Sequence, residues 1–363
     1  MDHLSISEAP NCIYPKRTIL LTLVESIARN EYPSPYTQAA RLQGRNIPDG
    51  DTIYYRLKEL TLDQVIKTAQ DGLGMIHSEA KDIGALDRPL PVALDLTEEP
   101  VYGKPDPSSI GSAKTNGTKF AHQLLTIQAV QGAHLLPLAI RKRTQVDQIP
   151  HVAGQALEAA RSVVPLETIL ADRAFWSVES IRTLMQYGNS FVVPAPENER
   201  MKEEIKKARF RSQQQGTRTE CIYIDPDFQI GESPNCVKFA VVYIFRPEEA
   251  RTRANGKKKP EHFVFGTKWP VTHEQALMLA DLYDHRWIIE TGYRDSDEFE
   301  GKTRSENPVI QWLFFLLSML LYAIWTFGRI SWVPRKNLVR FELTKFWVRY
   351  ILGHCTRWKT RAS

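Results

Sequence analysis

The chain has 363 residues, of which 42% are hydrophobic and 25% are charged, and its net charge is +5. These proportions exclude an intrinsically disordered chain and are typical of a globular protein with two or three domains. The basic charge is concentrated at one end, because nine Lys and Arg residues and only one acidic residue, Glu342, follow from Arg329 onward. Aromatic residues alternate with these cations. The segment can therefore neutralise phosphates, or it can form the solvated face of an amphipathic helix.

The cysteines and the first residues indicate the compartment. The four cysteines, Cys12, Cys221, Cys236 and Cys355, form no CxxC pair, which argues against a zinc site and gives no case for a disulfide framework. The first residues do not form a basic segment followed by an apolar one, so we expect no signal peptide and a cytoplasmic location.

The stretch from Val309 to Phe327 is apolar except for three residues and is nearly long enough to span a bilayer. A helix that is completely buried in a protein core is equally apolar on all sides. Because no other segment of the chain resembles it, we predict a buried core helix and no membrane partner.

Residues 1–88 read as a helical domain. A helix over 16–30 is followed by one that Ser34 and Pro35 would begin, ending near Gln43. After a glycine-containing turn, a third helix is expected over 51–60, with Asp51 as its cap. This third helix carries Tyr55, Arg56 and Lys58, and the arrangement resembles a helix-turn-helix DNA reader. A plain helical packing domain is the alternative.

The apolar pattern changes to a period of two near Pro89. It predicts a strand, a hairpin, a helix, a strand, a helix and a strand, at 90–96, 119–143, 151–164, 168–172, 177–187 and 190–194. This is the order of a ribonuclease H-like α/β fold, a mixed sheet flanked by helices in which the first and fourth strands are neighbours. We assign 89–195 and 271–330 to this core.

Two further segments complete the expected organisation. Residues 196–270 begin with a densely charged stretch and continue with three strand-like runs, two of which are separated by the lysine-rich turn 251–259. We interpret them as a β-rich insertion within the core. Residues 331–363 form the basic C-terminal segment.

Three acidic residues stand at positions that a catalytic site can use. Asp95 ends the apolar run that begins at Leu90, and Asp172 ends the short strand that begins at Thr168. Far downstream, helical spacing places Tyr283, Arg286, Glu290 and Arg294 on one stripe. Taken singly, an Asp after a strand is often a turn residue, and Arg with Glu four residues apart is often a surface ion pair.

Taken together, Asp95, Asp172 and Glu290 fit a site for two divalent metal ions. Two Mg²⁺ ions about 3.5–4 Å apart can activate an attacking oxygen and stabilise the leaving oxygen of a phosphodiester. Magnesium keeps several waters, so a few carboxylates suffice, and Mn²⁺ can substitute for it. Asp95 would bridge the ions, and the other two acids would each complete one of them. Arg286 could hold a phosphate as a bidentate fork and Tyr283 could donate to a phosphate oxygen.

These residues resemble a known family. The spacing Tyr283-x-x-Arg286-x-x-x-Glu290 resembles the Y-x-x-R-x-x-x-E signature of DDE transposases from bacterial and archaeal insertion sequences. Asp95-Leu-Thr, followed by Tyr102-Gly-Lys104, is similar to the first aspartate motif of this family, particularly in its archaeal-type branch. Asp172-Arg-Ala-Phe175 is similar to the second. The likeness covers roughly residues 89–321.

The resemblance implies binding to the terminal inverted repeats of an insertion sequence, DNA cleavage and transfer of the 3′ ends into target DNA, in a homodimeric synaptic complex at the nucleoid. The family's usual basic residue seven positions after the glutamate is Asp297 here. Arg294, Lys302, Arg304 and the motif residue Lys104 are then the further candidates for phosphate contact. Two alternatives remain: a nuclease that uses the same acids and stops at hydrolysis, and a catalytically impaired relative that only binds DNA.

Overall fold

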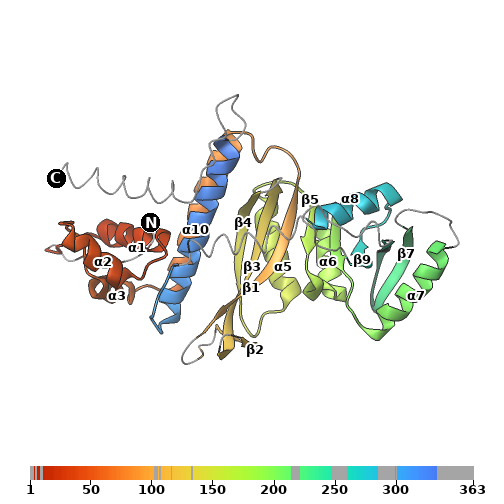
Figure 1. Cartoon of the computed structure of the whole chain (residues 1–363), viewed down its shortest axis with the longest axis horizontal. Helices are drawn as coiled ribbons and strands as arrows, with labels where there is room; N and C mark the ends of the chain where they lie inside the picture. The colour runs from red at the N-terminus through yellow and green to blue at the C-terminus, as the bar shows by residue number, and fades with distance from the viewer. Residues whose placement is uncertain are drawn as a thin grey trace.

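A mixed sheet is the centre of the molecule (Figure 1), and in the part of the chain that the computed structural model describes it has nine strands. The structure describes residues 4, 6–8, 11–101, 105, 108–115, 117–131, 134–213, 221–246, 260–284, 299 and 301–332. The strands are β1 (Leu90–Pro100), β2 (Ile110–Thr115), β3 (Thr118–Gln131), β4 (His134–Arg143), β5 (Leu166–Ala171), β6 (Ser190–Pro194), β7 (Cys221–Glu232), β8 (Asn235–Phe245) and β9 (His262–Thr267). Their order is β2-β3-β1-β5-β6-β9-β8-β7, and β4 also pairs with β3.

The predicted fourth strand, at 168–172, is β5 in the structure. It was predicted to lie beside the first strand, and this is confirmed, because β1 and β5 pair in parallel with Leu94 opposite Ala171. The predicted end of the first strand was wrong. β1 continues four residues past the predicted end at Leu96, to Pro100, since β3 keeps pairing with it beyond the end of β5. Strand β2 was not predicted either. Its sequence, Ile-Gly-Ser-Ala-Lys-Thr, lacks the apolar alternation of a half-buried strand, and it pairs only with β3.

The three strands of the 196–270 segment continue the core sheet. β9 pairs antiparallel with β6, and β8 and β7 follow in order. Helix α7 (Glu199–Gln213) packs on β7 and β8. The arginines of α7 hold it there, because Arg200, Arg209 and Arg211 lie 5.2–5.4 Å from the ring centroids of Phe228, Phe245 and Tyr223.

Helices cover both faces of the sheet (Figure 1). Helix α5 (Ile149–Arg161) packs on β3 and β4 from one side and also contacts α6 (Val178–Tyr187). On the other side, α10 (Pro308–Trp332) and α4 (Leu62–Asp82) pack on β4 and on each other. Helix α8 (His273–Asp284) packs on β6.

The apolar run at Val309–Phe327 is a core helix, as predicted. Leu316, Leu317 and Leu321 are buried, and Leu320 is half-buried. Helix α10 is the one helix among the described residues that is long and apolar enough to cross a membrane, but 72% of its most apolar window lies inside the protein.

The N-terminal helices are α1 (Lys16–Ala28), α2 (Pro33–Leu42), α3 (Gly50–Leu57) and α4. Two predicted caps were wrong. Helix α2 starts at Pro33 rather than at Pro35, since both prolines fit a first helical turn. Helix α3 is capped by Asp49, whose carboxylate accepts the Thr52 amide at 2.7 Å, and Asp51 lies in its first turn.

A buried ion pair fixes α2 against α1. Arg45 donates to the Glu25 carboxylate at 2.7 Å and to the Tyr36 hydroxyl at 2.7 Å. Glu25 is only 3% exposed, so the arginine and the tyrosine compensate for burying its charge. Burial, and then the hydrogen bond to Glu25, raise the pKa of Tyr36 far above its ordinary value.

Truncating the core side of α10 should destabilise the whole fold. We expect Leu313→Ala, at a residue that is 1% exposed, to lower the free energy of unfolding by about 2–5 kcal/mol, because it leaves a cavity. Ile324→Ala, on the same helix at a residue that is 46% exposed, is the matched control and should cost much less. Urea unfolding measures both. Equal effects would show that the buried side of α10 is assigned incorrectly.

Candidate active site

Asp95 and Asp172 are neighbours across two parallel strands. Leu94 of β1 pairs with Ala171 of β5, and each aspartate is the next residue of its strand or its extension. Asp172 is still extended, with φ −79° and ψ 177°. Adjacent strands lie about 4.8 Å apart, so the register brings together two carboxylates that are 77 residues apart in the chain.

Both carboxylates belong to the same face of the sheet, which we call the acidic face. Successive strand residues point to opposite faces, so Asp95 shares the face of Ala93, and Asp172 shares the face of Leu170. Ala93 and Leu170 belong to one buried cluster, whereas Leu94 and Ala171 belong to the other. Asp95 and Asp172 are both half-buried, which leaves part of each residue accessible.

Local contacts fix the direction of the Asp172 side chain. It caps the short 3-10 helix η1 (Arg173–Phe175), and its Oδ1 accepts the Ala174 amide at 2.9 Å. Phe175 anchors this turn, because its ring is fully buried. The second carboxylate is therefore held by a turn that the core itself fixes.

Polar residues of β3 lie beside Asp95 on the acidic face. Thr126 is directly opposite Asp95 and is completely buried, and Gln128 is opposite Ala93 and 1% exposed. Our sequence interpretation missed both. The signal was present in the sequence, since three even-numbered positions of β3, which share one face of the strand, are polar: His122, Thr126 and Gln128.

Helix α8 packs on the acidic face through residues at helical spacing. Ala276, Ala280 and Tyr283 join Ala93 and Leu170 in one buried cluster. Tyr283 is 8% exposed, and its ring stacks on Phe263 with the centroids 5.4 Å apart. The structure thus places Tyr283 among the residues that pack on the acidic face, whereas its contact with a phosphate stays a prediction.

Several predicted site residues lie outside the described part of the chain. These are Glu290, Arg286, Arg294 and Lys104, together with Asp297, the 251–259 turn and the C-terminal segment from residue 333. The third predicted carboxylate therefore has no described position, while α8 ends at Asp284, six residues before it.

Lys302 and Arg304 are described and exposed, but their segment lies along the N-terminal helices. The Arg304 guanidinium lies 5.0 Å from the centroid of the Tyr32 ring, and Thr303 hydrogen bonds to Tyr54 at 3.3 Å. Gly301 sits close to Ile27 and Phe314. These contacts connect the segment to α1, α3 and α10 rather than to the acid pair.

The donor chemistry of the acid pair fits a hard divalent cation. Two adjacent carboxylates on one face supply the oxygen ligands that Mg²⁺ or Mn²⁺ prefers. Within the described residues no three His, Cys, Asp or Glu side chains gather as a metal site.

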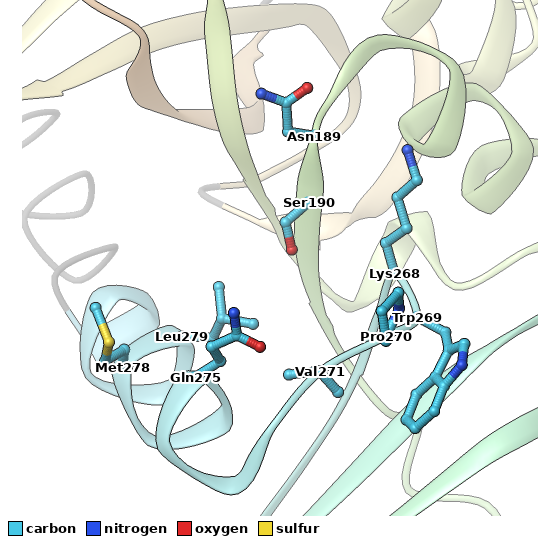
Figure 2. A pocket seen from close by; sticks show the side chains of 9 residues that line it. All are labelled: Asn189, Ser190, Lys268, Trp269, Pro270, Val271, Gln275, Met278 and Leu279. Atoms are coloured by element: carbon cyan, nitrogen blue, oxygen red, sulfur yellow. The ribbon is translucent and has the colours of Figure 1, made fainter.

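A separate pocket of about 390 Å³ lies between the start of β6 and the first turns of α8 (Figure 2). Its lining is mainly apolar, with Val271, Met278 and Leu279 on the side of α8 and its preceding loop, and Ser190 facing them from β6. Ser190 pairs with Thr168 at the opposite end of β5 from Asp172. None of the described residues that line this pocket is an aspartate or a glutamate, and Asp95 and Asp172 are not among them.

A mixed sheet in which β1 and β5 are parallel neighbours, with Asp95 in β1 and Asp172 directly after β5 on the same face, is typical of a ribonuclease H-like core. A family model described as "Transposase DDE domain" matches residues 89–324. The chain therefore belongs to the DDE transposase family, whose members are enzymes of the polynucleotidyl transferase type.

The fold is also similar to a solved transposase structure. The similar chain is described as "Cryo-EM structure of piggyBac transposase synaptic complex with hairpin DNA (SNHP)". The TM-score is 0.56 with 10% sequence identity, over 96% of this chain and 73% of that one, which shows the shared fold. A search of curated proteins found no match.

The adjacency of the two aspartates can be tested by cross-linking. In a protein whose native cysteines are replaced by Ser, we expect Asp95→Cys with Asp172→Cys to form a disulfide on mild oxidation. The expected Cα separation, about 5 Å, falls within disulfide range. Leu94→Cys with Asp172→Cys is the control, because Leu94 points to the other face, and it should stay reduced. Mass spectrometry of peptides reads both, and the reverse pattern would show that the strand register is wrong.

Proposed function

We propose that this protein is an insertion-sequence transposase of the archaeal-type branch that binds terminal inverted repeats, cleaves DNA and joins its 3′ ends to target DNA. The observation that carries the proposal is the register of β1 and β5, which sets Asp95 beside Asp172 on one face of a ribonuclease H-like sheet. The family match supports the transposase class, and the similar solved structure is described as a synaptic complex with hairpin DNA.

In this proposal Asp95 and Asp172, with Glu290 as the third ligand, hold two Mg²⁺ or Mn²⁺ ions. The ions would supply activation of the attacking oxygen and stabilisation of the leaving oxygen. The protein's part is placement: β1 and β5 fix the spacing of the two aspartates, and the η1 turn holds Asp172.

Cations are needed around the acids, since carboxylates alone repel a phosphate backbone. Arg286, Arg294, Tyr283 and Lys104 are the proposed phosphate contacts at the site. Lys302 and Arg304 are better placed to contact DNA that lies along the N-terminal helices, because their segment packs there. Tyr55 of α3 is 69% exposed and Lys58, directly after the helix, is exposed, which suits a helix that reads DNA.

The enzyme would act as a homodimer that brings two transposon ends together, in the cytoplasm at the nucleoid. Helix α10 packs in the core, which supports a role without a membrane. A nuclease built on the same acids would cut the same donor DNA and would yield no joined product.

Removing any one of the three acids should abolish Mg²⁺-dependent cleavage and leave DNA binding intact. The variants are Asp95→Ala, Asp172→Ala and Glu290→Ala, and the control is Glu167→Ala, an exposed carboxylate on β5. Cleavage and strand transfer are measured on a donor with matched ends, and binding is measured by gel shift. Cleavage that persists in one variant removes that residue from the site. Cleavage without joined products favours the nuclease.

The basic C-terminal segment should contribute to DNA affinity through phosphate contacts. Replacing Arg357, Lys359 and Arg361 by Ala should reduce the slope of log affinity against log salt by about two to three units, because each neutralised phosphate releases counterions. The measurement is a salt titration of DNA binding. An unchanged slope would show that these cations are solvated and that the contacts come from elsewhere in the chain.

A further inference from the structure

Two buried side-chain oxygens flank Asp95. Seven side-chain nitrogen and oxygen atoms of the described residues are inaccessible to solvent and have no hydrogen-bond partner, and two of them, Thr97 Oγ1 and Gln128 Oε1, lie on the strands next to Asp95. Such an oxygen costs about 1–3 kcal/mol if it stays unpaired, so a group outside the protein is expected to pair with it.

Both oxygens belong to residues on the acidic face. Thr97 is two residues after Asp95 on β1, and Gln128 is two residues after Thr126, which pairs with Asp95. Gln128 is therefore the diagonal neighbour of Asp95, at a Cβ separation of about 7–8 Å that a long side chain can bridge. Its own cross-strand partner is Ala93, whose side chain is a single methyl group.

The helices confirm which side of β3 this is. Leu124, four residues before Gln128, lines a small cavity with Ile66 of α4 and Leu316 of α10. The even-numbered residues of β3 therefore face these helices. At 1% exposure an apolar residue would be the stable choice for position 128, so a glutamine there indicates a use other than packing.

The proposed cations explain these oxygens. Mg²⁺ gives up its waters reluctantly, and a carboxylate-bound ion presents several water O–H donors to its surroundings. Acceptors just beyond the direct ligands orient such a site, and their loss typically weakens metal binding by about 10- to 100-fold. The two orphaned oxygens are acceptors of this kind, one on each side of Asp95 along the strand direction.

We propose that Gln128 and Thr97 are positioning residues that accept hydrogen bonds from the water shell of the divalent cation held at Asp95 and Asp172. This inference rests on the proposed function, because it requires a cation at the acid pair. Neither residue touches the metal. They fix the waters, and so determine which side of the ion remains open to the DNA phosphate.

The other explanation is a structural water that links the sheet to α10 and has no connection with the cation. The two explanations differ in what happens without metal. A structural water that stabilises the fold predicts that removing its acceptors lowers the unfolding temperature. A cation shell predicts no loss in the metal-free protein, since an unpaired hydroxyl replaced by a methyl group of the same shape is neutral or stabilising.

The experiment uses the full-length protein without DNA and two readouts, the unfolding temperature in EDTA and Mn²⁺ binding by electron paramagnetic resonance. Thr97→Val and Gln128→Leu should leave the unfolding temperature unchanged or higher and weaken Mn²⁺ binding about tenfold. Gln128→Glu keeps acceptor oxygens at this position and should bind Mn²⁺ at least as tightly as the wild type.

The matched control is Gln123→Leu, at a buried glutamine of the same strand that points to the opposite face and hydrogen bonds to Glu98 and Arg143. It should lower the unfolding temperature and leave Mn²⁺ affinity unchanged. Because Thr97→Val preserves shape, it remains informative even if Gln128→Leu fails to fold.

The variant Asp95→Ala distinguishes a failure of the proposed function from a failure of this inference. If Mn²⁺ binding survives in Asp95→Ala, the proposed metal site and the proposed function are wrong. If Asp95→Ala abolishes binding while Thr97→Val and Gln128→Leu bind Mn²⁺ like the wild type, the proposed function stands and this inference is overturned. A lower unfolding temperature with unchanged affinity would identify a structural water instead.

Discussion

The parallel pairing of β1 with β5 is the constraint on which the site depends. Backbone hydrogen bonds hold two segments that are far apart in the chain in one register, with Leu94 opposite Ala171. Because side chains alternate along a strand, a slip of one residue would turn one carboxylate into the opposite layer of the core. The apolar residues on either side of the aspartates prevent this slip, since each would then lose its buried position.

The rest of the sheet is arranged around that pairing. β3 pairs with β1 on one side of the two strands, and β6 pairs with β5 on the other. The acid pair therefore lies in the interior of the sheet rather than at an edge. The strands between residues 221 and 267 continue this sheet and carry the chain back to α8 on the acidic face. The segment between β6 and α8 thus brings the chain back to the face of the sheet on which the two aspartates lie.

The sequence allowed the order of the elements, the core helix α10 and the two strands next to Asp95 and Asp172 to be predicted, because each depends on a local signal. An alternating run shows a strand, and a run apolar on all sides shows a buried helix. Long-range pairing is not local. The extension of β1 beyond Asp95 depends on β3, and the position of Arg304 depends on Tyr32, more than 250 residues earlier. The polar residues of β3 are visible in the sequence, but the proximity of Gln128 to Asp95 follows only from the cross-strand pairing.

The packing of α4 has a consequence for the geometry of cutting. This helix directly follows α1, α2 and α3 in the chain and packs against α10 and β4. A hydrogen bond also links it to the sheet, because Nε2 of His77 lies 2.8 Å from the Pro137 carbonyl oxygen. Burial also lowers the pKa of His77, so this contact stays uncharged at neutral pH. The segment at 301–304 makes a second connection between the N-terminal helices and α10, which packs on the sheet. If the N-terminal helices read DNA, these contacts hold them at a fixed position relative to the acid pair. The number of base pairs between the recognised sequence and the cut is then set by the distance between these two parts of the protein.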